Sequence, residues 1–164
     1  MMTVLGCIAT EHNIWLVLVA AIVCSCGACA TMSLFHRAYL TSGQQHAGWL
    51  FLTAVAAGAS IWSTHFIAML AYVPAAPVDL DPILTIVSLL VAVAGTAIGF
   101  AVASNGRSVR MAAMGGAIVG LGISAMHYTG MVAYRVQGIV HWQLSYLIAS
   151  IVLAIALSAI ALFV

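Results

Sequence analysis

Two histidines each stand four residues before a methionine, inside long apolar stretches of the chain. The pairs are His65 with Met69 and His127 with Met131. Residues four apart lie on one face of a helix, so each pair presents an imidazole and a thioether in the same direction. Thioether sulfur is a soft ligand that favours Cu(I), and imidazole suits both oxidation states of copper. The residue types therefore predict a copper site.

Other interpretations of these residues stay open. A haem with histidine or methionine axial ligands would use the same side chains, but it needs a large flat cavity. A redox enzyme or electron-transfer site is a further alternative, although no nucleophile–base pair is evident in the sequence. A metal-free structural network is another, because a histidine in a membrane helix commonly bonds a neighbouring helix and methionine is an ordinary apolar filler. A proton path through the membrane ranks last, since no polar residues connect the two faces.

The elements that must position these residues are membrane helices. The 164-residue chain is 65% hydrophobic and 4% charged, whereas a soluble domain carries about 25% charged residues. Its four cationic residues are too few for a nucleic-acid-binding surface. A helix crosses a bilayer with about 20 apolar residues. We therefore expect an all-α, polytopic bundle of five transmembrane helices, over Asn13–Phe35, Ala47–Tyr72, Pro82–Ser104, Met111–Tyr134 and Trp142–Val164.

The few charges predict the orientation of the bundle. The connections on one side carry Arg37, Arg107 and Arg110, and those on the other carry Glu11, Asp79, Asp81 and Arg135. By the positive-inside rule the arginine-rich side is cytoplasmic, which places the N-terminus outside and residue 164 at the cytoplasmic side. Asp79 and Asp81, among prolines, indicate a turn and a helix start. The N-terminus lacks the basic region of a cleavable signal peptide.

The two histidine motifs belong to an internal repeat. A shift of 62 residues places His65 on His127 and Tyr72 on Tyr134, and it also places Ser88 on Ser150 in the following apolar stretch. The predicted unit is therefore a two-helix hairpin with the motif near the outer end of its first helix. Because each unit crosses the membrane twice, the copies share one orientation. Small residues around both motifs favour close approach of the two helices.

At "MHYTGM", Met126 to Met131, the chain resembles the MHYT family of bacterial integral-membrane sensor domains, and "HFIAM", His65 to Met69, resembles a looser first copy. The resemblance covers the whole chain. It implies a domain of seven spans and three motifs in the bacterial inner membrane, of which this chain would be a truncated copy lacking the third motif and the last two spans. Thr64 stands where the family commonly has Met, which removes any ligand role for that position.

The resemblance also implies a function. The domain would bind copper and sense a diatomic gas (O2, CO or NO) or redox state, and signal to a cytoplasmic output domain such as a cyclic-di-GMP synthase or hydrolase. The chain itself would be no enzyme, and a homodimer stays open. The ligands would be drawn from His65, Met69, His127, Met131 and His12, with supporting roles for Met126, Tyr128, His141 and Cys7. Met126 ranks lower, because helix periodicity turns it about 100° away from His127.

Three further cysteines, Cys24, Cys26 and Cys29, lie within the first predicted helix. Small polarizable residues at such positions most often serve close helix packing, so neither a disulfide framework nor a metal role is expected for them.

Overall fold

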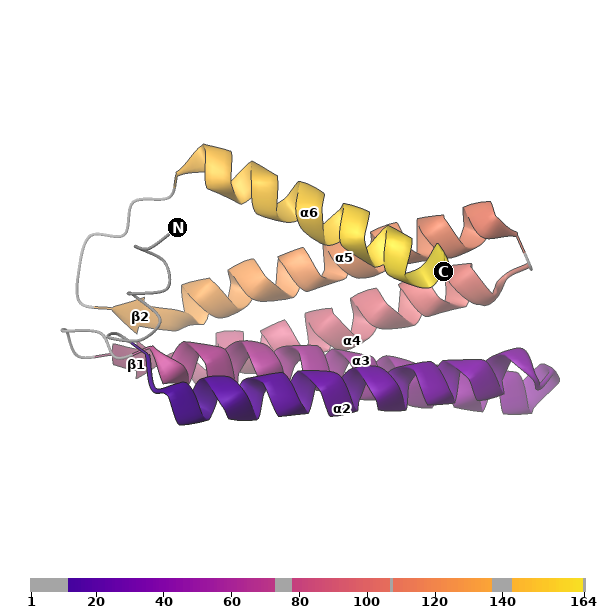
Figure 1. Cartoon of the computed structure of the whole chain (residues 1–164), viewed down its shortest axis with the longest axis horizontal. Helices are drawn as coiled ribbons and strands as arrows, with labels where there is room; N and C mark the ends of the chain where they lie inside the picture. The colour runs from indigo at the N-terminus through magenta and orange to yellow at the C-terminus, as the bar shows by residue number, and fades with distance from the viewer. Residues whose placement is uncertain (1–11, 73–77, 107, 137–142, 164) are drawn as a thin grey trace.

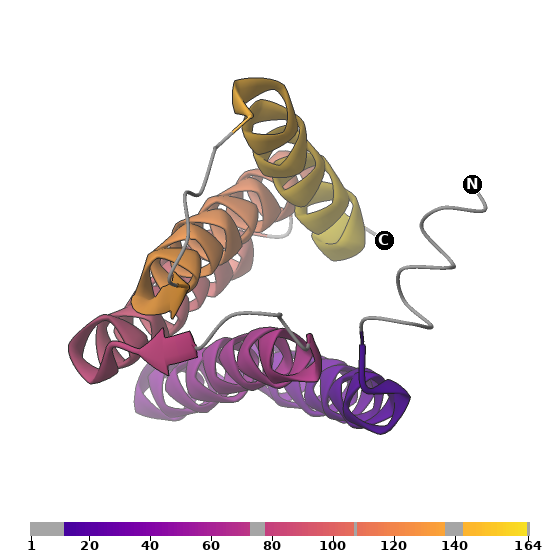
Figure 2. The ribbon, with the colours of Figure 1, turned by 90° about the vertical axis from the view of Figure 1, so that its left-hand side faces the viewer.

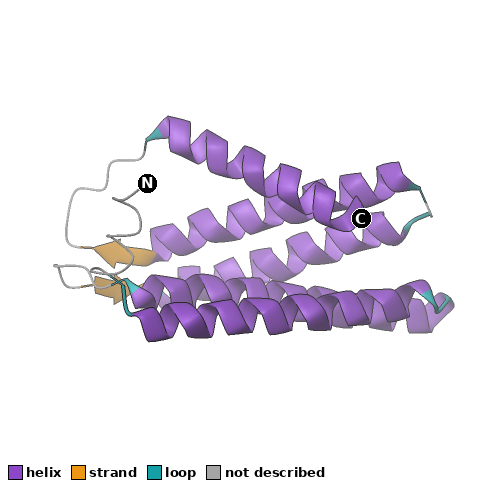
Figure 3. Cartoon of the chain, viewed as in Figure 1, coloured by secondary structure: helices purple, strands orange, loops and turns teal. Residues whose placement is uncertain are grey.

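A computed structural model of the chain describes residues 12–72, 78–106, 108–136 and 143–163 (Figure 1). Its helices are long and apolar enough to cross a membrane, which confirms the predicted all-α polytopic bundle. Two short strands that the sequence did not predict lie at one end of it (Figure 3), because three residues are too few for an alternating pattern to stand out. The elements are α2 (Ile14–Tyr39), α3 (Gly43–Ala71), β1 (Val78–Leu80), α4 (Pro82–Ser104), α5 (Val109–Ala133), β2 (Tyr134–Val136) and α6 (Leu144–Phe163).

Each helix packs against the next one along the chain, α2 on α3, α3 on α4, α4 on α5 and α5 on α6. Seen end-on, the helices form an open arc with α2 and α6 at its two ends (Figure 2). The bounds of α4 agree with the prediction, Pro82–Ser104. The prediction ended the first helix at Phe35, but α2 continues through the polar His36 and Arg37. The prediction began the second helix at Ala47, whereas α3 begins at Gly43. The apolar stretch marks only part of each helix, because backbone hydrogen bonds continue the helix beyond it.

The starts of α2 and α4 are tied to the ends of the helices that follow them. The N–H of Asn13 donates to the carbonyl of Ala71 at 2.7 Å, and the N–H of Asp81 donates to the carbonyl of Ala133 at 2.9 Å. Asn13 and Asp81 are the N-caps of α2 and α4, and Ala71 and Ala133 correspond in the repeat. The junction between α2 and α3 is therefore built like the junction between α4 and α5.

Asp81 also anchors this end of the bundle electrostatically. Its Oδ1 accepts the backbone N–H groups of Ile83 and Leu84, and its Oδ2 accepts from Arg135 of β2 at 2.6 Å. The N–H of Leu84, followed by the Arg135 guanidinium, holds the pKa of the Asp81 carboxyl below its ordinary value. The prediction of a helix start at Asp81 is confirmed.

Glycines set the distances between helices, at positions that also repeat. A Cβ added to Gly58 of α3 would lie 2.7 Å from the Cα of Val93 in α4. One added to Gly120 of α5 would lie 2.7 Å from the Cα of Ile155 in α6. The same shift relates both pairs, so the α3–α4 and α5–α6 interfaces share one backbone-to-backbone contact that only a residue without a side chain permits.

A polar contact between the helices of each hairpin repeats as well, but with a different aromatic residue. In the first hairpin the indole N–H of Trp62 donates to Ser88 Oγ at 3.0 Å and to a carbonyl of α4. In the second, the hydroxyl of Tyr128 bonds Ser150 Oγ and a carbonyl of α6. The bonded serines and carbonyls correspond in the repeat, whereas Tyr128 corresponds to Phe66, one turn beyond Trp62. In each copy the corresponding serine is therefore hydrogen-bonded by an aromatic side chain, but the two aromatic residues stand on adjacent turns of the helix.

The glycine contact leads to a testable expectation for the hairpin α5–α6. In Gly120→Ala the added methyl would meet the carbonyl oxygen of Ala154 at 2.5 Å, so the helices must separate. We expect the free energy of unfolding in detergent micelles to fall by about 1–3 kcal/mol. Gly48→Ala is the matched control, because its Cβ meets nothing within 4 Å. Equal stabilities of the two variants would contradict the role of Gly120 in packing.

Candidate functional site

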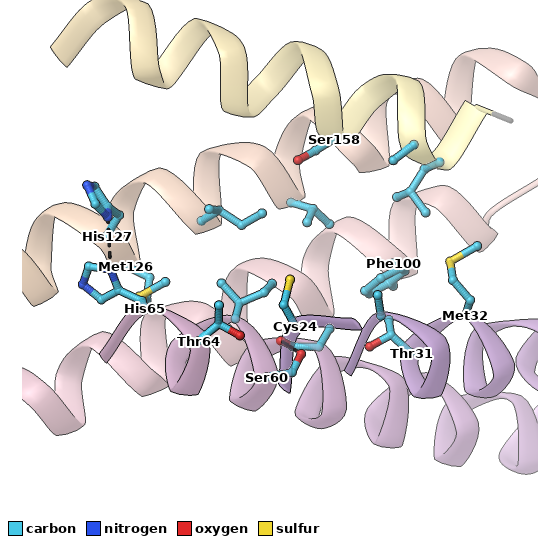
Figure 4. A pocket seen from close by; sticks show the side chains of 17 residues that line it. Cys24, Thr31, Met32, Ser60, Thr64, His65, Phe100, Met126, His127 and Ser158 are labelled. Atoms are coloured by element: carbon cyan, nitrogen blue, oxygen red, sulfur yellow. Dashed lines mark hydrogen bonds between the residues drawn. The ribbon is translucent and has the colours of Figure 1, made fainter. Parts of the chain in front are cut away.

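The structure brings the two motif histidines into direct contact. Nδ1 of His65 on α3 lies 3.2 Å from Nδ1 of His127 on α5. The ring centroids are 4.8 Å apart and the ring planes make an angle of 70°. Figure 4 shows the two side chains facing each other across the gap between α3 and α5. The prediction that the two motifs face each other is confirmed for the histidines. They come from the two copies of the repeat, so the contact lies where the copies meet.

Gly130 of the second motif makes room for this contact. A Cβ at that position would lie 2.6 Å from Nε2 of His65 and 3.0 Å from its Cδ2. Gly130 is buried, and the ring of His65 is held on another side by an edge contact with Phe66, at a centroid distance of 5.1 Å. The imidazole of the first copy thus lies against bare backbone of the second.

A separation of 3.2 Å between the two Nδ1 atoms suits two chemical states. In a hydrogen bond, the Nδ1–H of one ring donates to the bare Nδ1 of the other, so the pair shares one proton. In a metal site, ligand bonds of about 2.0–2.1 Å would give a nitrogen–metal–nitrogen angle of roughly 100–105°, close to tetrahedral. The distance between the two nitrogens is therefore compatible with two ligands of one metal ion.

A cavity of about 460 Å³ adjoins the histidine pair. Its walls come from all five described helices, and His65, His127 and Met126 line the end shown at the left of Figure 4. Met126 is 1% exposed. Helix periodicity had ranked it low as a partner of His127, but the cavity faces a wide arc of α5, so that consecutive residues both reach it. Met126 is therefore the methionine that lines the cavity at its histidine end, whereas Met32 lines the far end.

The other predicted ligands lie elsewhere. Met69 and Met131 are partly buried, and neither is among the described residues that line the cavity. The ring of His12 packs on Tyr72, with centroids 5.3 Å apart, and Tyr72 follows His65 by seven residues, about 10 Å of helix. The ligand roles of these three residues stay predictions. Cys7 and His141 lie outside the described residues.

Within the described ranges, no three side chains among His, Cys, Asp and Glu come together as a metal-binding group. Among the described residues, a metal ion at the histidine pair would therefore need sulfur from methionine to complete its coordination.

Sequence reasoning missed several polar residues of the cavity. The family resemblance gives Thr64 no ligand role, yet Thr64 lines the cavity beside His65. The repeat could have identified it, because the same shift that aligns the histidines places Thr64 on Met126. Cys24, Thr31 and Ser60 also line the cavity, and Cys24 and Thr31 come from α2, which carries no motif. No signal in the sequence connects them to the histidines.

Comparison with known proteins agrees with this repeat. The family model MHYT, described as a bacterial signalling protein N-terminal repeat, matches residues 58–116 and 120–164. The chain belongs to the MHYT family. The two matches follow one another along the chain, and each includes one of the paired histidines. The first match begins at Gly58, which makes the close contact between α3 and α4.

Three curated relatives match this MHYT chain. An uncharacterized signaling protein of Caulobacter vibrioides is 45% identical over 85% of the chain. Two proteins of Pseudomonas aeruginosa are each 36% identical: the bifunctional diguanylate cyclase/cyclic di-GMP phosphodiesterase MucR over 94% of the chain, and the cyclic di-GMP phosphodiesterase NbdA over 70%. The chain spans 17%, 23% and 15% of these relatives, respectively. No solved structure matches it.

Gly130→Ala tests the geometry of the histidine pair. The new methyl would displace the ring of His65 and separate the two Nδ1 atoms. In metal-free protein carrying ¹⁵N-labelled histidine, we expect the wild type to show a scalar coupling between the two Nδ1 nuclei across the shared proton. That coupling should disappear in Gly130→Ala and persist in Gly48→Ala. Its persistence in Gly130→Ala would show that the ring has space that the structure does not give it.

Proposed function

We propose that this MHYT domain is a membrane sensory module that binds copper at the His65–His127 pair, and that it senses a diatomic gas or redox state there. The observation that supports the proposal is the 3.2 Å separation of the two Nδ1 atoms, which suits two ligands of one ion. Copper, when bound, supplies a redox-active centre to which a diatomic gas can coordinate. The domain carries no catalytic step of its own in this proposal.

Each residue at this site has a separate role in holding the copper ion. His65 and His127 supply one nitrogen each from the two copies, and Met126 supplies a thioether from the adjoining wall. The buried position of Met126 favours Cu(I), because soft sulfur ligands in an apolar surrounding stabilise the reduced ion. Gly130 keeps the ring of His65 in place.

Signal transmission would pass through the helices that hold the ligands. His127 precedes Tyr128, whose hydroxyl bonds Ser150 of α6, so a change in the position of α5 reaches α6 directly. The described side chains of α6 are partly or fully exposed, and its packing partner is α5. For the signal to pass, the copper site must bind two arrangements of these helices with different affinity.

We further propose the orientation and the output. Asp79, Asp81 and Arg135 lie at the strand-bearing end, whereas Arg37 and Arg110 lie at the opposite end, so the positive-inside rule would place the strands outside and the end of α6 at the cytoplasmic side of the bacterial inner membrane. Two of the relatives are named as enzymes that make or degrade cyclic di-GMP. In a longer protein, the module would regulate such a cytoplasmic domain.

Copper content tests the proposal. Protein reconstituted with Cu(I) under reducing conditions should retain about one ion per chain, and His65→Ala/His127→Ala should retain none, because two of the ligands are lost. His36→Ala is the matched control, since this exposed histidine lies at the opposite end of α2. Elemental analysis of the purified proteins measures the result. Equal copper in the wild type and the double variant, or none in either, would refute the copper site and leave a structural histidine pair.

The same experiment distinguishes the sulfur ligands. Met126→Leu should weaken Cu(I) binding by on the order of tenfold or more, as the loss of groups around a metal commonly does. If Met69→Leu/Met131→Leu has the larger effect, the ligand set predicted from the motif spacing is the correct one. His12→Ala tests the remaining predicted ligand.

A further inference from the structure

Two aromatic side chains of α3 connect His65 to the neighbouring helix α4. The ring of Phe66 makes an edge contact with His65, with centroids 5.1 Å apart and an interplanar angle of 80°. Trp62 lies against the ring of Phe66, at a centroid distance of 4.9 Å. Phe66 is 7% exposed, and a close-packed interior leaves such a ring little space to move alone. A displacement of the His65 ring therefore displaces Phe66, which in turn displaces Trp62.

The indole of Trp62 is fixed to α4 at two points. Its N–H donates to the carbonyl of Thr85 at 3.1 Å and to Oγ of Ser88 at 3.0 Å. The hydroxyl of Ser88 itself donates to the same Thr85 carbonyl, at 2.7 Å. The serine oxygen is thereby left to accept from the indole, which can only donate. Because Ser88 is fully buried, bulk water does not compete for this bond, and the position of Trp62 follows that of α4.

The same part of α4 is also bonded to α5, the helix that carries His127. Oγ1 of Thr85 donates to the carbonyl of Asp81 at 2.7 Å, and the N–H of Asp81 donates to the carbonyl of Ala133 at the end of α5. Here α4 therefore contacts both histidine-bearing helices, α3 through the indole of Trp62 and α5 through the backbone of Asp81. A change in the distance between the two histidines acts on both contacts.

The second copy makes an equivalent connection from its own histidine. The ring of His127 makes an edge contact with Tyr128, at a centroid distance of 5.1 Å and an angle of 78°, nearly the geometry of the contact in the first copy. The hydroxyl of Tyr128 bonds Ser150 of α6 directly. In both copies the histidine ring is thus connected to a serine of the following helix, and the shift of 62 residues relates the two serines.

Trp62 is required only in the first copy, because Phe66 has no hydroxyl. The position that corresponds to Trp62 in the second copy is Ser124, whose hydroxyl donates to the carbonyl of Gly120 in its own helix at 3.0 Å. Ser124 thus bonds within α5, whereas Trp62 crosses to α4. Different side chains reach corresponding end points in the two copies, which favours a role for the connection over simple filling of space.

We propose that Trp62 is a positioning residue of the histidine pair. Held by α4, it fixes the ring of His65 through Phe66, and it passes a displacement of that ring back to α4. The histidine pair then acts on two helices in parallel, on α4 through Trp62 and on α6 through Tyr128. The positioning role does not depend on a metal, whereas the transmission rests on the proposed sensory function.

Tryptophan NMR of the complete chain tests this role. The chain has four tryptophans, so the ¹⁵N-labelled indole resonances are few, and the resonance lost in Trp62→Phe is that of Trp62. In metal-free protein in detergent micelles, His127→Ala removes the hydrogen-bond partner of His65. We expect the indole N–H resonance of Trp62 to shift, whereas that of Trp49, near the opposite end of α3, should stay in place. His127→Gln, a second variant with a polar side chain, should give a shift as well. No shift at Trp62 in either variant would overturn the proposal.

Phe66→Leu shows whether the effect follows the proposed line of contacts. Leucine keeps an apolar side chain at this position but removes the ring between His65 and Trp62, so the shift caused by His127→Ala should be lost. Phe35→Leu is the matched control, because Phe35 of α2 is equally buried, 7% exposed, and in this variant the shift should persist. A shift of the same size with and without the Phe66 ring would show that Trp62 senses the histidines by another route, and it would overturn the proposal.

Copper measured on the same samples separates this proposal from the proposed function. Loading of the wild type with Cu(I) disturbs the histidine pair without a substitution, and it should also shift the Trp62 indole resonance. Copper retained without that shift would overturn the transmission and leave the copper site standing. If the wild type retains no copper while His127→Ala still shifts the Trp62 resonance, the positioning role is supported and only the metal site is refuted.

Discussion

A polar group inside a bilayer has no water to bond, so each hydroxyl, imidazole and backbone amide must find its partner within the protein. Much of this structure follows from that constraint. Serine and threonine side chains of the helices return to carbonyls of their own turn, as Ser25 does with Ala21. Where α2 and α4 begin, the N-cap amides are bonded by the ends of α3 and α5. Among the described residues, the buried side-chain atoms without a hydrogen-bond partner belong to Thr31, Thr64 and His65, which all line one cavity.

The repeat satisfies this constraint twice with related solutions. α4 lies between α3 and α5, whereas α2 packs on α3 and α6 packs on α5 at the two ends of the arc. The contacts recur at backbone level, through glycine, while side chains at matched positions differ. Thr64 and Met126 illustrate this, since they occupy corresponding places beside the two histidines and carry different chemistry. A duplicated scaffold has thus produced a site with unequal halves.

The sequence predicted the helices well, because apolar length is nearly decisive in a membrane. It also predicted that the histidines meet, from their matched depth and the small residues around them. It did not predict that Met126, rather than Met69 or Met131, lines the cavity beside the histidines. Side chains at i and i+4 share a face of one helix, whereas several helices together form the cavity. For the same reason, Thr31 could not be related to His65, although both line one cavity. The sequence did not predict the two short strands, because backbone pairing at a helix end leaves no pattern of side chains.

The use of Trp62 in one copy and Tyr128 in the other affects how the two copies of the repeat should be aligned. The serines that take part in the hydrogen bond stand in register, whereas their aromatic partners are offset by one helical turn. An alignment of the two halves that matched tryptophan to tyrosine would be wrong by four residues, and it would place the histidines out of step. The small hydroxyl residue, not the large aromatic, is the dependable marker of equivalence between the copies.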